Sequence, residues 1–147
     1  MRIAVGADHG GYELKQRIAE YLIAQGHQVQ DFGTHSAEPA DYPDMAAPLA
    51  RAVAAGEAER GVLVCGTGIG MSMTANKIPG IRAAVCTDCY MARMAREHND
   101  AHILCLGGRV LGIGSALDIV QVFLSSEFAG GRHARRVDKI SALEGKE

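Results

Sequence analysis

One stretch, Gly61–Ser72 (GVLVCGTGIGMS), limits the fold more than any other part of this chain. It begins with a short run of apolar, β-branched residues, Val62–Val64, which is typical of a strand buried in a parallel sheet. Cys65 follows, and then the glycine-rich turn GTGIG. The pattern predicts a buried strand, a tight turn, and a helix that starts near Gly68 and runs to about Asn76.

The same stretch carries chemistry as well as structure. Without Cβ atoms in the way, the backbone N–H groups of Gly66, Gly68 and Gly70 can point into one concavity, which suits an anion at the start of a helix. The dipole of that helix would favour the thiolate form of Cys65. The stretch therefore offers a base or nucleophile beside donors for an oxyanion. A buried core cysteine above a packing turn fits the pattern equally well.

Strands and helices alternate along the rest of the chain. Before Gly61, the apolar patterns predict strands at 2–7 and 28–32, and helices at 12–25 and from residue 41 or 42 to about 55. Beyond the glycine turn they predict strands at 81–85 and 101–106, and helices at 88–98, 115–124 and 134–143. Such alternation is typical of βαβ units around a parallel sheet, whose ligands bind outside the carboxyl ends of the strands.

Length and composition exclude several classes of protein. The 147 residues suit a single domain, 1–147, which can bury roughly 68–70% of its unfolded surface. No apolar run is long enough to span a membrane, and the formal net charge of −2 gives no general attraction to nucleic acid or to an anionic membrane. Because a strand rather than a leader follows Met1, we expect the four cysteines to be free thiols in the cytoplasm.

Two motifs invite a cofactor or a metal. Asp88 lies twenty residues after Gly68, where a ribose-binding acid is found in dinucleotide sites, but GTGIG lacks the spacing G-x-G-x-x-G. The run from Cys86 to His102 reads C-x2-C-x8-H-x3-H, whose middle gap is shorter than the twelve residues or so of a zinc finger. We therefore expect no cofactor and no metal, and we interpret the two cysteines as small apolar groups at a strand end.

Polar residues at the ends of predicted elements supply further candidates. Asp8 and His9 follow the first strand, where they can hydrogen-bond hydroxyls and move protons, or form a solvated turn. Arg132 and Arg136 are four residues apart, and cations at a helix N-terminus are unfavourable unless an anion lies there. They suit a phosphate if the helix starts by Arg132, and a solvated basic face is an equal alternative.

The position of His98 and Asn99 poses a geometric problem. They end a helix that starts at the carboxyl edge of the sheet and runs back along it. Eleven residues of helix rise about 16 Å, so His98 should not meet Cys65 within one chain. A two-fold interface would bring the two together twice.

Seven segments together resemble ribose-5-phosphate isomerase B and related sugar-phosphate isomerases. They cover nearly the whole chain in order: DHGGYELK (8–15), DYP (41–43), CGTGIG (65–70), NKIPGIRAA (76–84), REHND (96–100), GGRV (107–110) and GGRHARRVDKI (130–140). The resemblance implies a Rossmann-like three-layer α/β sandwich with a five-stranded parallel sheet, and no metal or redox cofactor. It implies a homodimer or tetramer with active sites at the subunit interface, so that His98 and Asn99 come from the partner.

The resemblance also implies a role for each candidate. Cys65 would carry a proton between C2 and C1 of the open-chain sugar, Thr67 would assist, and the amides of Gly66–Gly70 would hold the enediolate oxygen. Ring opening would fall to Asp8 and the partner's His98. Tyr42 and Asn99 would contact the sugar hydroxyls. The phosphate would be held by His9, Arg109, Arg132 and Arg136.

Three positions refine the assignment. One branch of the family has a glutamate just after the last glycine of the loop, and Met71 at that position places this chain in the cysteine branch. His102 stands where asparagine is usual, and Ala129 stands where an acidic residue is common, which weakens only the choice of substrate.

The base, the oxyanion donors, the ring-opening pair and the phosphate anchor are the four parts that aldose–ketose isomerisation needs. The sequence therefore predicts an isomerase of ribose 5-phosphate. Galactose 6-phosphate, allose 6-phosphate or a tetrose phosphate are alternative substrates, sometimes with a second, different subunit. A non-catalytic sugar-phosphate binder is a further alternative, against which Cys65 and Thr67 argue, since binding alone needs no thiol.

Overall fold

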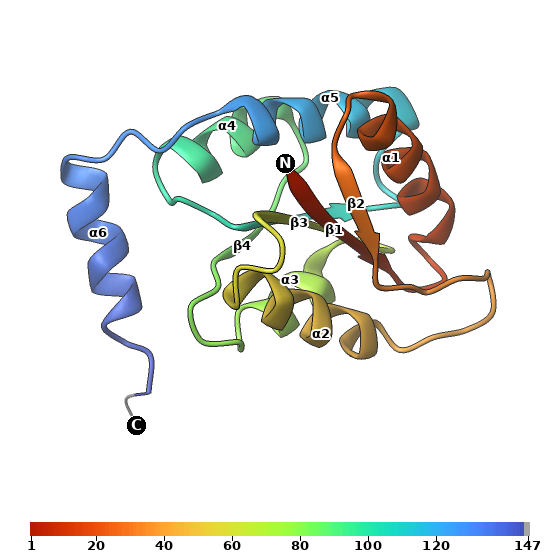
Figure 1. Cartoon of the computed structure of the whole chain (residues 1–147), viewed down its shortest axis with the longest axis horizontal. Helices are drawn as coiled ribbons and strands as arrows, with labels where there is room; N and C mark the ends of the chain where they lie inside the picture. Colours follow the sequence, from red (N-terminus) through yellow and green to blue (C-terminus); the bar gives the residue numbers. More distant parts are fainter. Residues whose placement is uncertain (146–147) are drawn as a thin grey trace.

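The computed structural model describes residues 1–145, in which five parallel strands form one sheet between two layers of helices (Figure 1). The strand order is β2-β1-β3-β5-β4, and every neighbouring pair is parallel. The predicted three-layer α/β fold is confirmed. The strands are β1 (Arg2–Ala7), β2 (Gln28–Asp31), β3 (Arg60–Cys65), β4 (Ala83–Val85) and β5 (Ile103–Gly107).

Helices cover both faces of the sheet, and an apolar core lies beneath each layer. Figure 1 shows α1, α4 and α5 on one face and α2 and α3 on the other. Side chains alternate along β3, so Val62 and Val64 join the first core, and Leu63 and Cys65 join the second. Cys65 therefore faces α2 and α3. These layers comprise α1 (Tyr12–Ala24), α2 (Tyr42–Ala54), α3 (Ile69–Ala75), α4 (Cys89–Glu97) and α5 (Ile113–Ser125).

The last helix starts two residues earlier than the sequence predicts. The sequence predicts 134–143, and α6 spans Arg132–Ser141, because the N–H groups of His133 and Ala134 already donate to the carbonyls of the two preceding glycines. Arg132 and Arg136 therefore lie one helical turn apart on one face, which meets the condition set above for a phosphate contact.

The strand predicted at 81–85 is also shorter than expected. β4 begins only at Ala83, because the N–H of Arg82 donates to the ring of His102 instead of to a neighbouring strand. The other helix and strand boundaries agree with the predicted ones to within two residues.

Helix α6 stands apart from the two layers (Figure 1). The segment after α5 carries it away from the sheet, and contacts at each end tie it back. The ring of His133 stacks on that of His98, and the N–H of Gly80 donates to Glu144 at 2.8 Å. No helix within residues 1–145 has the length and apolar character needed to cross a membrane.

Candidate active site

Three loops converge at the carboxyl ends of β1, β3 and β5. The N–H of Asp8 donates to the carbonyl of Val64 at 3.2 Å, and that of Gly108 to the carbonyl of Cys65 at 2.8 Å. The contact between the first and third loops is so close that a Cβ on Gly108 would lie 2.6 Å from the carbonyl oxygen of Gly10. The edge of the sheet is therefore fixed by backbone contacts, and side chains placed on it have little freedom.

The thiol of Cys65 lies at the end of β3, almost buried, with 5% of its surface exposed. The N–H of Gly68 donates to its Sγ at 3.1 Å. Only glycine suits that position, since Gly68 has φ +84° and a Cβ there would lie 3.0 Å from the backbone of Leu106. The turn thus supplies a backbone donor that fixes the position of the sulfur at the end of β3.

The amide groups of the glycine turn are not all available to a ligand. That of Gly68 is taken by sulfur, and the N–H of Ile69 donates to the Thr67 hydroxyl oxygen at 3.2 Å. Because the Thr67 oxygen accepts this bond, its own O–H proton can still be donated to a substrate oxygen.

An open pocket of about 410 Å³ lies over Cys65, within the volume range of small-molecule sites. The ring of Tyr42, at the start of α2, covers Gly70 so closely that a Cβ on that glycine would lie 2.5 Å from it. The pocket brings together four sequence-predicted side chains and the glycine turn. Its lining consists of Asp8, Tyr42, Cys65, Gly66, Thr67, Ile69, Gly70 and Met73.

A second hollow of about 320 Å³ adjoins the first and is lined by His9, Gly10 and Arg109, among others. The Arg109 guanidinium lies beside Gly66, which lines the first pocket, because a Cβ on that glycine would lie 3.4 Å from one of its nitrogens. The Nδ1 of His9 lies 3.1 Å from the N of Ala40 and 3.3 Å from the carbonyl oxygen of that residue, so the backbone of Ala40 fixes the ring. The hollow thus has an imidazole and a guanidinium, both suited to an anion.

The structure does not bring His98 and Asn99 to this pocket. They follow α4 and lead into β5, whose first residue, Ile103, pairs with Gly61 at the opposite end of β3. Four residues of strand, about 13 Å, separate Gly61 from Cys65. The predicted separation within one chain is thus confirmed.

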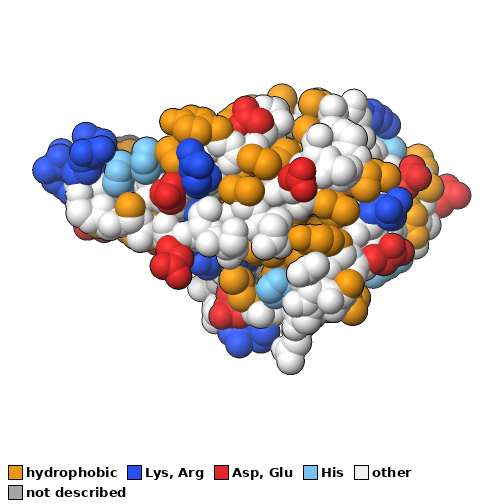
Figure 2. Space-filling model, turned by 90° about the horizontal axis from the view of Figure 1, so that it is seen from above, with side chains coloured by type: hydrophobic (Ala, Val, Ile, Leu, Met, Phe, Trp, Pro, Cys, Tyr) orange, Lys and Arg blue, Asp and Glu red, His pale blue; other side chains and the backbone are white. Residues whose placement is uncertain are grey.

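Arg132 and Arg136 lie with His98 instead of with Cys65. The rings of His98 and His133 stack with centroids 4.0 Å apart and planes 8° apart, which joins the end of α4 to the first turn of α6. Reduced hydration, and then the nearby His98 and the two arginines, lower the pKa of His133. Figure 2 shows Lys, Arg and His side chains gathered on the projecting end of the molecule.

Comparison with known proteins agrees with this geometry. Residues 3–140 match the family described as Ribose/Galactose Isomerase. The chain belongs to the ribose/galactose isomerase family. It is 48% identical over 143 residues to ribose-5-phosphate isomerase B of Escherichia coli (strain K12). The match covers 97% of this chain and 96% of the Escherichia coli protein. It is 45% identical over 148 residues to D-erythrulose-4-phosphate isomerase of Pectobacterium atrosepticum, covering 100% of this chain and 97% of that one.

A solved structure also falls in the ribose/galactose isomerase family. Clostridium thermocellum ribose-5-phosphate isomerase B superposes with a TM-score of 0.98 at 60% identity, and the match covers 99% of both chains. The family resemblance inferred from the seven segments is confirmed.

Three side chains of interest were not predicted from the sequence: two at the Cys65 pocket and one beside His98. Ile69 and Met73 line the mouth of the Cys65 pocket yet are 49% and 65% exposed, although their helical spacing resembles that of core residues. His133 stacks on His98, and the only signal for it was its place between two arginines of the predicted phosphate group. Large apolar side chains exposed around a pocket are typical of ligand-binding grooves and of protein–protein interfaces.

The cysteine pair of the C-x-x-C motif is split between two environments. Cys86 is buried, and burial, followed by the charge of Asp88, raises the pKa of its thiol to about 12. It is thus a small apolar core residue, as the sequence predicts, whereas Cys89 is exposed at the start of α4. Within residues 1–145, no three His, Cys, Asp or Glu side chains gather closely enough to hold a metal ion.

Proposed function

We propose that the chain, a sugar-phosphate aldose–ketose isomerase, interconverts ribose 5-phosphate and ribulose 5-phosphate with Cys65 as the proton-carrying base. The observation that carries this proposal is the sulfur of Cys65 at the pocket, held by the Gly68 N–H at 3.1 Å. The neighbouring hollow with His9 and Arg109 supports a phosphorylated substrate. The reaction needs no metal and no cofactor.

Isomerisation begins on the open-chain aldose. The Cys65 thiolate removes the proton from C2, the electron pair forms the C1–C2 double bond, and the charge moves to O1. Free amides of the glycine turn stabilise this enediolate. The O2 proton passes to O1 through the Thr67 hydroxyl, and Cys65 returns its proton to C1, which leaves a ketone at C2.

Ring opening precedes this step when ribose 5-phosphate enters as a furanose. Asp8, which lines the pocket, works with the partner's His98. One of the pair takes the proton of the C1 hydroxyl as the C1–O4 bond breaks, and the other gives a proton to O4. Tyr42 and the partner's Asn99 position the sugar hydroxyls.

The phosphate is held by groups from both chains. His9 and Arg109 contribute from the hollow beside the pocket, and the partner contributes its Arg132 and Arg136. The Nε2–H of His9 donates to a phosphate oxygen, since Nδ1 is already engaged by Ala40. Binding energy from this remote group orients C1 and C2 against the thiol.

The same reasoning supports an assembly. We propose a homodimer, or a tetramer of two such dimers, in the cytoplasm, each chain forming a single domain over 1–147. A two-fold interface over the exposed Tyr42, Ile69 and Met73 would cover these apolar side chains. It would also bring the partner's His98 and α6 to the Cys65 pocket, and would do so twice.

Related substrates are tested directly. The Pectobacterium atrosepticum relative is named for a tetrose phosphate, and the family name includes galactose. Purified protein is assayed with ribose 5-phosphate, galactose 6-phosphate, allose 6-phosphate and erythrulose 4-phosphate. We expect the highest kcat/KM for ribose 5-phosphate. A higher value for another sugar phosphate would contradict the assignment, and a ligand-induced rise in Tm without turnover would identify a binder.

A further inference from the structure

The turn that carries His98 and Asn99 is bound to the neighbouring strand by one side chain. Arg82 stands just before β4 and donates from Nε to the carbonyl of Asn99 at 2.8 Å. One of its terminal nitrogens donates to the carbonyl of Asp100 at 3.0 Å and lies 3.5 Å from the carboxylate of that residue. A planar guanidinium makes these contacts together, which the single ammonium of a lysine cannot.

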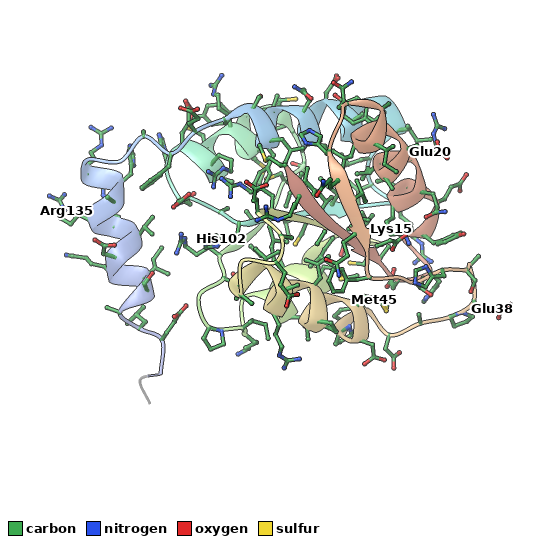
Figure 3. All side chains as sticks on the ribbon, in the orientation of Figure 1. Lys15, Glu20, Glu38, Met45, His102 and Arg135 are labelled. Carbon is green, nitrogen blue, oxygen red and sulfur yellow. The ribbon has the colours of Figure 1, made fainter. Side chains whose placement is uncertain are left out.

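The backbone of Arg82 is fixed to the same segment. Its N–H donates to Nδ1 of His102 at 3.0 Å, and its carbonyl accepts the N–H of His102 at 2.8 Å. Desolvation and then the charge of Arg82 lower the pKa of His102 to about 4, so the ring is neutral at pH 7 and can accept a hydrogen bond. Figure 3 labels His102 on the side of the body nearest α6 in that view.

A second arginine holds the turn from within. Arg96 is 3% exposed, and one of its nitrogens donates to the Asp100 carboxylate at 2.9 Å and to the carbonyl of Ala101 at 2.7 Å. Asp100 has φ +47°, a left-handed conformation that is uncommon outside glycine and is strained for most other residues. Such a conformation persists only where its surroundings impose it, and here the two arginines do so.

We propose that Arg82 is a positioning residue for the isomerase reaction. It fixes the turn 98–100 so that His98 and Asn99 are presented to the partner's pocket in the geometry that ring opening requires. This inference rests on the proposed function, in which His98 opens the ring. Arg82 acts through the turn and not on the reacting atoms, and it leaves the Cys65 step of the same reaction unaffected.

The substrate pair separates the two steps. Ribulose 5-phosphate has no furanose form, because the hydroxyl that would close the ring carries the phosphate. The exchange of its C1 hydrogen in D2O, followed by proton NMR, therefore reports enediolate formation alone. Conversion of ribose 5-phosphate reports ring opening in addition.

We expect Arg82→Met to slow conversion of ribose 5-phosphate by about 10–100-fold, the usual cost of a misplaced catalytic group. Exchange of the C1 hydrogen of ribulose 5-phosphate should change little, and His98→Asn should show the same split more strongly. Arg82→Lys keeps the charge without bridging both carbonyls, and should fall between Arg82→Met and wild type. The matched control is Arg60→Met, because Arg60 lies at the same end of the sheet but donates to the adjacent Glu59 carbonyl at 2.7 Å.

Each result has one meaning. Equal loss in C1 exchange of ribulose 5-phosphate and in conversion of ribose 5-phosphate, as a purely structural role would give, or no loss in either, overturns the role of Arg82. Circular dichroism and Tm check the fold, and Arg82→Lys decides the question if Arg82→Met unfolds below the assay temperature. Wild type without activity on ribose 5-phosphate would instead refute the proposed function, and His98→Asn without the split would remove ring opening from His98.

Discussion

The carboxyl edge of the sheet and the end of α4 with α6 are built in opposite ways. At the edge, loops are joined by amide–carbonyl bonds and close glycine contacts, and Asp8 and Cys65 are almost buried. At the other region, side chains make the connections, through the arginines that hold Asp100 and the stacked rings of His98 and His133.

This difference teaches how a site can be divided between two chains. In the proposed function the carboxyl edge, with Asp8, Cys65 and the glycine turn, is the rigid half of the site and supplies the base, the oxyanion donors and the pocket. The end of α4 with the first turns of α6 is the presented half, whose His98, Arg132 and Arg136 would reach the pocket of a partner. The predictions below test this division, beginning with the largest expected effect.

Cys65→Ala removes the centre of the rigid half. We expect kcat/KM for ribose 5-phosphate to fall on the order of 10²–10⁴-fold, because a general base is lost, while substrate binding persists. Steady-state rates measure the first effect, and the substrate-induced rise in Tm measures the second. Rates within a few-fold of wild type would show that Cys65 is not the base.

Mixing Cys65→Ala with His98→Asn tests the division itself. Each variant alone should be nearly inactive in converting ribose 5-phosphate. After subunit exchange, half of the dimers are mixed and each holds one intact site, so about a quarter of all sites should recover. Native mass spectrometry confirms the mixed dimers. Mixed dimers without recovery would put Cys65 and His98 in one chain's site.

Arg136→Ala weakens the presented half at its phosphate contact. Loss of a charged hydrogen bond costs about 1.5–3 kcal/mol, or about 10–150-fold in kcat/KM for ribose 5-phosphate. Free ribose should lose little. Arg135→Ala is the matched control, because Figure 3 shows Arg135 on the same helix pointing away from the body. An equal loss on ribose and ribose 5-phosphate would argue against a phosphate contact.

His102 makes the presented half more sensitive to acid. Its pKa is about 4 in the folded chain and near 6.5 when unfolded, because of desolvation and of Arg82, with Asp100, Arg60 and Arg96 also nearby. Between these values the unfolded state binds a proton that the folded state does not. Stability is therefore full above about pH 6.5 and falls, by up to about 3 kcal/mol, as the pH drops to 4.

The substitution His102→Asn isolates that contribution. Asparagine can still accept a hydrogen bond but does not titrate, so the variant should lose less stability on acidification. Urea unfolding of both proteins at several pH values between 7.5 and 4 measures the difference. Parallel losses in wild type and variant would show that other groups cause the acid sensitivity.

Local patterns were sufficient to predict the fold and the rigid half. The run from Val62 to Gly70 combines strand, turn and helix signals that depend only on neighbouring residues, and β3, the Gly68 turn and α3 follow them. The alternation of side chains along a strand also explains why Cys65 faces the pocket under α2 and α3.

The second region depends on contacts that no local pattern encodes. Arg82 meets Asn99 across seventeen positions of sequence, and His98 stacks on a histidine of a different helix. The exposure of Met73 also could not be predicted, because helical spacing does not distinguish a face packed in the core from an exposed apolar face. The expected roles of His98 and Asn99 came from the family resemblance. The contacts of Arg82 with the turn 98–100 came from the structure.

The close glycine contacts have a consequence for how this enzyme can acquire new substrates. A methyl group on Gly108 would press on the carbonyl of Gly10, and one on Gly11 would press on that of Val64, so this edge accepts almost no variation. A library aimed at longer or shorter sugar phosphates should therefore leave these glycines alone. It should keep His98 and the two arginines of α6, and randomise the loop 33–41, whose Ala40 contacts His9 and where changes in side-chain size reshape the site without breaking the sheet.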